Sequence, residues 1–145
     1  MEANKLLGAS PEAIYGLEGI HRRFYEVRQR ILDAFCKDIK WDLVFIPNPD
    51  DLHQDHQVTA MEAMRAFKQS TILAYEVMGT PIAADFFIEV SIGDVCKKEA
   101  AIAKYKSVPY KQYFEPGFFQ SLATVRGAQI RKPYAEAFKF IRGIM

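Results

Sequence analysis

The sequence has few of the features that mark disulfide-rich, membrane-spanning or strongly charged proteins. Its two cysteines, Cys36 and Cys96, are too few and too far apart for a disulfide framework or a C-x-x-C metal site. No apolar run approaches the roughly 20 residues that a membrane helix needs, and no signal-peptide pattern is visible. The formal net charge is only +1, which gives no argument for nucleic acid or an anionic membrane as a partner. We therefore expect a cytoplasmic protein whose partner is a small or neutral molecule or another protein.

The apolar residues are arranged as in a layered α/β domain. Half of the residues are hydrophobic, and a chain of this length buries roughly two-thirds of its unfolded surface, so residues 1–145 are expected to form one domain. The predicted strand from Asp42 to Ile46 carries a continuous apolar run, as in a parallel strand that is covered on both faces. The order of expected elements indicates an α/β fold. Helices are predicted at 19–37, 58–67, 95–105, 118–125 and 134–141, and further strands at 71–77 and 86–92.

Some residues of these helices have expected roles. The arginines of the first helix should form its solvated face. Asp94 should cap the helix at 95–105, and residues 1–7 could form a separate helical fragment. The helix at 58–67 should bury apolar residues that recur at three-residue spacing, namely Val58, Met61, Met64 and Phe67.

Polar side chains gather directly after the first predicted strand. Two imidazoles and three carboxylates lie within the seven residues from Asp50 to His56. In open α/β sheets, ligands bind at the carboxyl ends of strands, so this density suggests a site. One ring could bind zinc while the other, held by Asp55 or Asp51, serves as an acid or polarising group. In the alternative interpretation, the aspartates cap the next helix and both histidines are solvated. The spacing alone leaves both open.

Other polar residues are weaker candidates. Glu76 ends the second predicted strand and could approach the site, or it could face solvent. Arg126 and Arg131 could hold an anionic group, although exposed salt bridges are the commoner use of such residues. The aromatic segment 105–117 could close over a sugar ring or pack on the core. His21, near the start of the first long helix, is expected at the surface or as a cap.

Several ordered motifs resemble one family. Asp51-Leu52-His53-Gln54-Asp55-His56 resembles D-x-H-x-D-H, the second signature of the PIG-L/LmbE-like zinc-dependent N-deacetylases. The resemblance extends over nearly the whole chain from about Glu2. Its further matches are a strand that ends in Tyr75-Glu76, a strand at 86–92 followed by Lys97, R-G-x-Q at 126–129 and Y-A-E-x-F at 134–138.

The resemblance implies a fold, a cofactor and residue roles. The fold would be a Rossmann-like, mostly parallel sheet flanked by helices, and the cofactor would be zinc. His56 would be a zinc ligand, and His53 would stabilise the oxyanion or protonate the leaving amine. Asp55 would orient a histidine. Asp51 and Arg126 would support these groups or contact the substrate, an N-acetylated amino sugar or a similar small molecule.

One part of the family pattern has no counterpart here. The first signature, A-H-P-D-D-E, supplies two zinc ligands and the general base on the first strand, and the start of this chain instead resembles a region about a third of the way into a family member. A smaller departure is Ser107-Val108 in place of Ser-Gln. We therefore expect an incomplete deacetylase, with weak zinc binding and no activity as an isolated chain. The alternative is an inactive remnant or split-protein subunit that acts by association with an N-terminal fragment or with itself.

Overall fold

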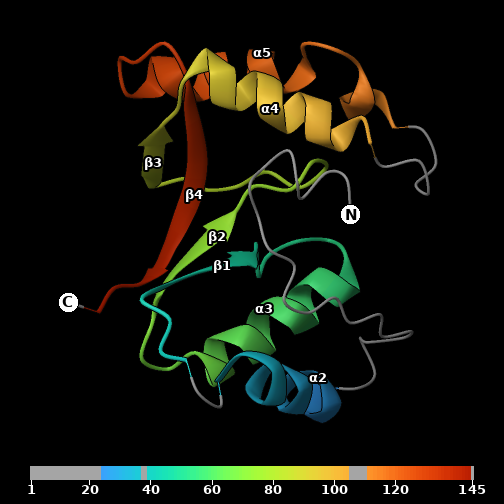
Figure 1. The fold of residues 1–145 in the computed structure, drawn as a ribbon, viewed down its shortest axis with the longest axis vertical. Coiled ribbons are helices and arrows are strands. Elements are labelled where there is room, and N and C mark those ends of the chain that lie inside the picture. Colours follow the sequence, from blue (N-terminus) through green and yellow to red (C-terminus); the bar gives the residue numbers. More distant parts are fainter. Residues whose placement is uncertain (1–23, 37–38, 105–110, 145) are drawn as a thin grey trace. The chain divides into compact units, whose positions relative to one another are not determined.

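The computed structural model describes residues 24–36, 39–104 and 111–144, which form a mixed α/β structure with helices flanking a four-stranded sheet (Figure 1). The sequence therefore predicted the α/β class correctly, although the sheet is mixed and not mostly parallel. In chain order the elements are α2 (Phe24–Ile31), the π-helical η2 (Leu32–Cys36), β1 (Leu43–Pro47), α3 (Gln54–Ala66), β2 (Thr71–Tyr75), β3 (Phe86–Glu89), α4 (Ile92–Ile102), the 3-10 helix η3 (Gln112–Phe114), α5 (Phe118–Gln129) and β4 (Ala135–Arg142).

The sheet has the strand order β1-β2-β4-β3. β1 runs parallel to β2, with Leu43 opposite Thr71 and Pro47 opposite Tyr75. β2 runs antiparallel to β4, and the register shifts between Ile72 and Leu73. The prediction of a helix at residues 134–141 was wrong, because this segment is β4. Its alternating buried alanines, Ala135 and Ala137, suit a strand.

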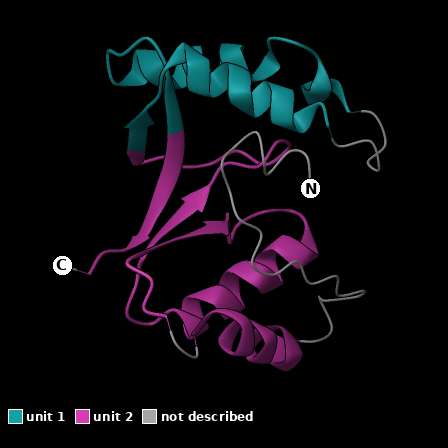
Figure 2. Ribbon diagram, viewed as in Figure 1, with its two compact units in different colours: residues 1–14, 87–136 teal, residues 15–86, 137–145 magenta. Residues whose placement is uncertain are grey.

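The described residues form two compact units, and one of them contains those between 24 and 86 and those from 137 to 144 (Figure 2). The other contains described residues between 87 and 136. The single domain expected for residues 1–145 stays a prediction. The predictions for residues 1–7, His21, Tyr105 and Tyr110 lie outside the described part of the chain. No helix in the described part is long and apolar enough to cross a membrane.

The core of the unit that contains β1 lies between β1, β2 and α3. Ile46, Ile72 and Ala74 from the strands pack with Ala60 and Ala63 from α3. As predicted, Val58 is buried and both Met64 and Phe67 pack against this cluster. Met61 is exposed instead, so three-residue spacing overstated the width of the apolar face. This packing holds α3, and with it the loop that precedes α3, against the carboxyl end of β1.

A buried ionic cluster joins α2 to α3. Glu62 is fully buried, and its carboxylate accepts hydrogen bonds from the Arg28 Nε at 2.5 Å and from Arg65. Burial alone would raise the pKa of Glu62, but the two guanidinium groups outweigh it and hold that pKa below its ordinary value. The arginine run of the first helix was predicted to be a solvated face. Arg28 departs from this, because it pairs with a buried carboxylate.

The unit that contains residues 87–136 is built around α4 and α5. Ser91 caps α4 and forms a capping box with Asp94, so the cap is Ser91 and not Asp94 as the sequence suggested. Glu99 on α4 accepts hydrogen bonds from the backbone N–H groups of Gly117 and Gln120 at the start of α5. These contacts tie the two helices together.

Candidate functional site

The loop between β1 and α3 is shaped by a buried asparagine. Asn48 is 2% exposed, its side-chain oxygen accepts from the Asp50 N–H at 3.2 Å, and its carbonyl accepts from the Asp51 N–H at 3.0 Å. Such an asparagine turn reverses the chain directly after a strand. Lys139 on β4 pairs with the Asp50 carboxylate at 2.6 Å. The turn therefore delivers Asp51, His53 and His56 to the carboxyl end of β1, where the sequence predicted a site.

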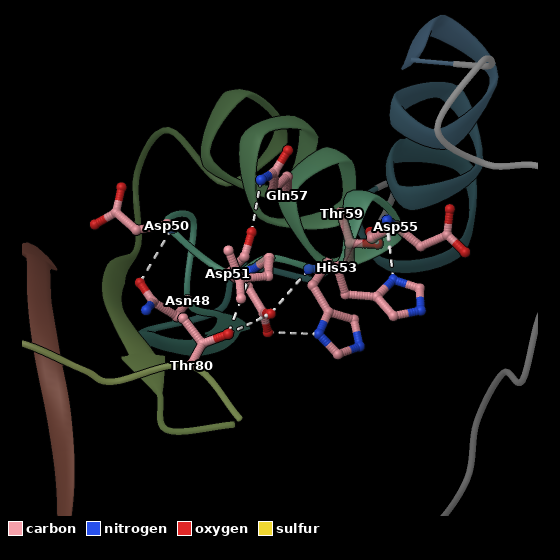
Figure 3. Close-up of polar contacts among 10 residues, drawn as sticks. Asn48, Asp50, Asp51, His53, Asp55, Gln57, Thr59 and Thr80 are labelled. Atoms are coloured by element: carbon pink, nitrogen blue, oxygen red, sulfur yellow. Dashed lines mark hydrogen bonds and ion pairs between the residues drawn. The ribbon is translucent and has the colours of Figure 1, made fainter. Parts of the chain in front are cut away.

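Asp51 is the centre of this loop (Figure 3). It is 3% exposed, and its Oδ1 accepts from the His53 N–H at 3.0 Å and the Thr80 hydroxyl at 2.9 Å. Its Oδ2 lies 2.7 Å from His56 Nδ1. Burial by itself would raise the pKa of Asp51. The hydrogen bonds from His53, His56 and Thr80 outweigh burial and lower the pKa below its ordinary value, so the carboxylate is ionised near neutral pH.

The hydrogen-bond network determines which ring nitrogen of His56 carries a proton. An ionised carboxylate only accepts hydrogen bonds, so the His56 Nδ1 must donate to Asp51. In the neutral ring, Nε2 then keeps its lone pair. A histidine whose Nδ1–H is held by a carboxylate is typical of metal ligands, because the contact sets both the tautomer and the ring orientation. His56 can therefore coordinate a metal through Nε2.

His53 has the opposite tautomer. It is the N-cap of α3, and its Nδ1 accepts from the Asp55 backbone N–H at 3.2 Å. In the neutral ring the proton therefore lies on Nε2, which can donate a hydrogen bond. The two rings stack, with centroids 4.6 Å apart. The site thus places a lone-pair nitrogen and an N–H donor on adjacent rings.

These contacts also bear on the alternative interpretation, in which the aspartates cap the helix and both histidines are solvated. The cap of α3 is a histidine and not an aspartate, and His56 lies inside the helix with its ring held by Asp51. Asp55 contacts His53 through its backbone, while the carboxylate on His56 is that of Asp51. The role predicted for the Asp55 carboxylate stays a prediction.

Sequence reasoning missed two residues of this site. Thr80 contacts Asp51, and its hydroxyl also accepts from the Leu52 N–H at 3.3 Å. Tyr75 ends β2, and burial together with the charge of Asp51 raises the pKa of its phenol. Tyr75 could have been found, because neighbouring parallel strands end at the same edge. Thr80 could not, because nothing local marks it.

The remaining candidates lie elsewhere in the chain. Arg126 is on α5, in the other unit, where its guanidinium donates to Gln129 at 3.2 Å. Of the aromatic segment, Tyr113 and Phe114 contact each other with ring centroids 4.8 Å apart. The predicted roles of Arg126 and of this segment in binding a substrate stay predictions.

The zinc hypothesis can be tested against the available donors. A catalytic zinc takes about three protein ligands. Within residues 24–36, 39–104 and 111–144, no group of three or more histidine, cysteine, aspartate or glutamate side chains is arranged to hold a metal ion. The hydrogen-bond network leaves His56 Nε2 with a lone pair that can bind a metal. His53 Nδ1 already accepts a hydrogen bond as the cap of α3. These residues do not fit a complete zinc site.

Solved structures resemble this chain in fold. No family model and no curated protein matches the sequence. A conserved protein from Thermus thermophilus matches with a TM-score of 0.62 and 19% identity, over 99% of this chain and 71% of its own. The N,N'-diacetylchitobiose deacetylase from Pyrococcus horikoshii, solved with an inhibitor, matches with a TM-score of 0.62 and 18% identity, over 97% of this chain and 60% of its own. The protein therefore shares the mixed α/β fold of an LmbE-like deacetylase, and it spans only part of the length of these proteins.

Proposed function

We propose that this chain carries the histidine-bearing part of a zinc-dependent N-deacetylase site that acts on an N-acetylated amino sugar or a similar small molecule. The observation that carries the proposal is the pair of histidines with opposite tautomers at the carboxyl end of β1. The fold shared with a diacetylchitobiose deacetylase supports the reaction class. The proposal concerns only part of a zinc site, because the side chains of the described residues do not supply a complete set of metal ligands.

Each residue has a distinct role in this proposal. His56 would hold the metal through Nε2, and Asp51 fixes its ring in the tautomer that this requires. The His53 Nε2–H donates to the amide oxygen as that atom gains charge, or supplies a proton to the leaving amine. Asp55 presents its backbone N–H to His53 and thereby maintains the second tautomer. Arg126 is proposed to contact the substrate.

The second candidate function is association without catalysis. The incomplete donor set within the described residues favours a subunit of a split protein, or an inactive remnant, whose function requires another chain. In that case a second polypeptide would supply the remaining metal ligands beside the two histidines.

The decisive experiment measures acetate release from N-acetylglucosamine and N,N'-diacetylchitobiose in the presence of zinc. We expect no activity above background from the chain alone, because a general base contributes about 10²–10⁴-fold and the A-H-P-D-D-E signature that supplies it in the family has no counterpart in this sequence. Adding a fragment that carries the A-H-P-D-D-E signature should restore activity. In this mixture His56→Ala should lose zinc and activity together, whereas His53→Ala should keep zinc and lose turnover.

The outcomes separate the candidates. Turnover by the lone chain that His56→Ala leaves unchanged would refute the assignment of the site. A mixture that forms a complex and stays inactive would favour association without catalysis.

A further inference from the structure

Within the described part of the chain, the Asp51 carboxylate is held by three hydrogen bonds, and one of them comes from a distant segment. The His53 N–H and the His56 Nδ1 belong to the same loop and first helical turn as Asp51. Thr80 lies 29 residues away in sequence, and its hydroxyl is 2.9 Å from Oδ1 (Figure 3). The first two donors move with the loop, so Thr80 is the contact that fixes the carboxylate relative to the rest of the fold.

A tight turn sets the position of Thr80. The Thr80 N–H donates to the Val77 carbonyl at 3.3 Å, and Gly79 between them has a φ of +103°, which glycine adopts without strain. Val77 follows the end of β2 at Tyr75 by two residues. The side chain of threonine is also stiff, because it branches at Cβ. The turn therefore presents the hydroxyl from a point close to the end of β2.

The hydrogen bonds of Thr80 determine where its proton lies. The Leu52 N–H donates to the Thr80 Oγ1 at 3.3 Å. A hydroxyl has one proton and an ionised carboxylate only accepts, so Thr80 must donate to the Asp51 Oδ1. Donation from Leu52 polarises the hydroxyl and makes it a better donor. A directed chain thus runs from the Leu52 N–H through Thr80 to Asp51, whose other oxygen accepts from His56.

The ring of His56 depends on this chain for its orientation. Its side chain is 37% exposed, so packing alone does not hold the ring. The ring contacts the Asp51 Oδ2 at 2.7 Å and stacks on His53, which is itself exposed. The buried carboxylate is therefore the firmer of the two contacts, and its own orientation depends on Thr80.

We propose that Thr80 is a positioning residue of the histidine pair. By donating to the Asp51 Oδ1, its hydroxyl keeps Oδ2 where it holds the His56 ring in one orientation. Thr80 acts only through Asp51. Its effect on turnover rests on the proposed deacetylase function, whereas its effect on the ring does not and can be measured in the chain alone.

NMR of the nitrogen-labelled full chain tests the effect on the ring. The His56 Nδ1–H should give a downfield signal, because its hydrogen bond to Asp51 slows exchange with water. Thr80→Val keeps the shape of the side chain without the hydroxyl and should speed this exchange about 10-fold, as expected for the loss of one hydrogen bond to a charged group. The proton should stay on Nδ1, since the carboxylate remains. Thr80→Ser restores the hydroxyl and should restore slow exchange.

The matched control is Thr59→Val, the same change on α3 three residues after His56. The Thr59 hydroxyl donates to the Asp55 carbonyl at 2.7 Å and does not contact Asp51, so exchange at His56 should be unchanged. Equal acceleration in Thr59→Val would overturn the proposal, because a general loosening of the helix would then explain the effect. Wild-type exchange in Thr80→Val, fast exchange in Thr80→Ser or a wild type without the downfield signal would also overturn it.

Kinetics test the consequence for the proposed function. In the mixture with the fragment that carries A-H-P-D-D-E, Thr80→Val should lower kcat about 10-fold and leave KM nearly unchanged, because a misaligned ring affects the reacting step. An unchanged kcat beside faster exchange would overturn the role of Thr80 in turnover. If the wild-type mixture is inactive, the proposed function fails, and the NMR result still decides whether Thr80 positions the ring.

Discussion

The substitution Asp51→Asn tests whether one carboxylate determines the tautomer of His56. The amide oxygen can replace Oδ1 and still accept from the His53 N–H and the Thr80 hydroxyl. Its NH₂ group then faces the His56 Nδ1, which must become an acceptor. The amide cannot turn over, because its NH₂ would then face the His53 N–H. The proton of His56 therefore moves to Nε2, and the lone pair available for a metal is lost.

The stability cost should be moderate because the hydrogen bonds persist without the charge. A hydrogen bond to a charged group is worth about 1.5–3 kcal/mol and a neutral one about 0.5–1.5 kcal/mol, so the expected loss is about 1–2 kcal/mol in the free energy of unfolding. For a chain of this size that corresponds to about 2–8 °C in Tm. The pKa of Asp51 is lowered in the folded state, so its carboxylate stabilises the fold above the unfolded-state pKa. This advantage disappears as the pH falls, and the wild type and Asp51→Asn should converge in acid.

Nitrogen NMR of the His56 ring identifies the protonated nitrogen, and calorimetry measures zinc affinity. In Asp51→Asn we expect the proton on Nε2 and zinc binding weaker by about 10–100-fold. The control Thr80→Val removes one hydrogen bond to Asp51 and keeps the carboxylate, so it should lose similar stability with the tautomer unchanged. An Asp51→Asn variant that keeps the proton on Nδ1 and binds zinc as the wild type does would refute this account.

Three further predictions follow from other contacts. Glu62→Ala leaves two arginines without their shared buried carboxylate and should cost about 3–5 kcal/mol in urea unfolding. Glu89→Ala removes an exposed ion pair with Lys132 and should cost less than about 1 kcal/mol in the free energy of unfolding. Equal costs for Glu62→Ala and Glu89→Ala would contradict the importance of burial. Ser91→Ala should speed hydrogen exchange in the first turn of α4 and cost about 0.5–2 kcal/mol, and an unchanged exchange rate would refute its role as the cap. Zinc should dissociate on dialysis against a mild chelator, and stoichiometric retention would contradict the incomplete donor set.

Local patterns in the sequence were sufficient for several features. The apolar run of β1, the periodicity of α3 and the cluster of polar residues between them predicted polar side chains at a strand end, and in the structure they lie there. These features depend on neighbours within a few residues, where backbone geometry fixes which side chains share a face. The positions of His53 and His56 in the fold could therefore be predicted.

Other features depended on contacts between distant segments. Residues 134–141 contain alanine, glutamate and lysine, which favour helix locally, but pairing with β2 makes the segment a strand. The exposure of Leu43 and Phe45 follows from the place of β1 at the end of the sheet, which no pattern within the strand encodes.

The chemistry of the histidine pair also required the tertiary structure. The sequence offered Asp51 and Asp55 equally as partners for a ring. Folding buries Asp51 against Thr80, which lies 29 residues further along the chain, and directs its carboxylate to the His56 Nδ1. A tautomer is determined by the donors and acceptors within hydrogen-bonding distance of each nitrogen. The sequence by itself determined where two histidines would lie, and only the folded chain decided which nitrogen of each keeps its lone pair, because those partners come together only on folding.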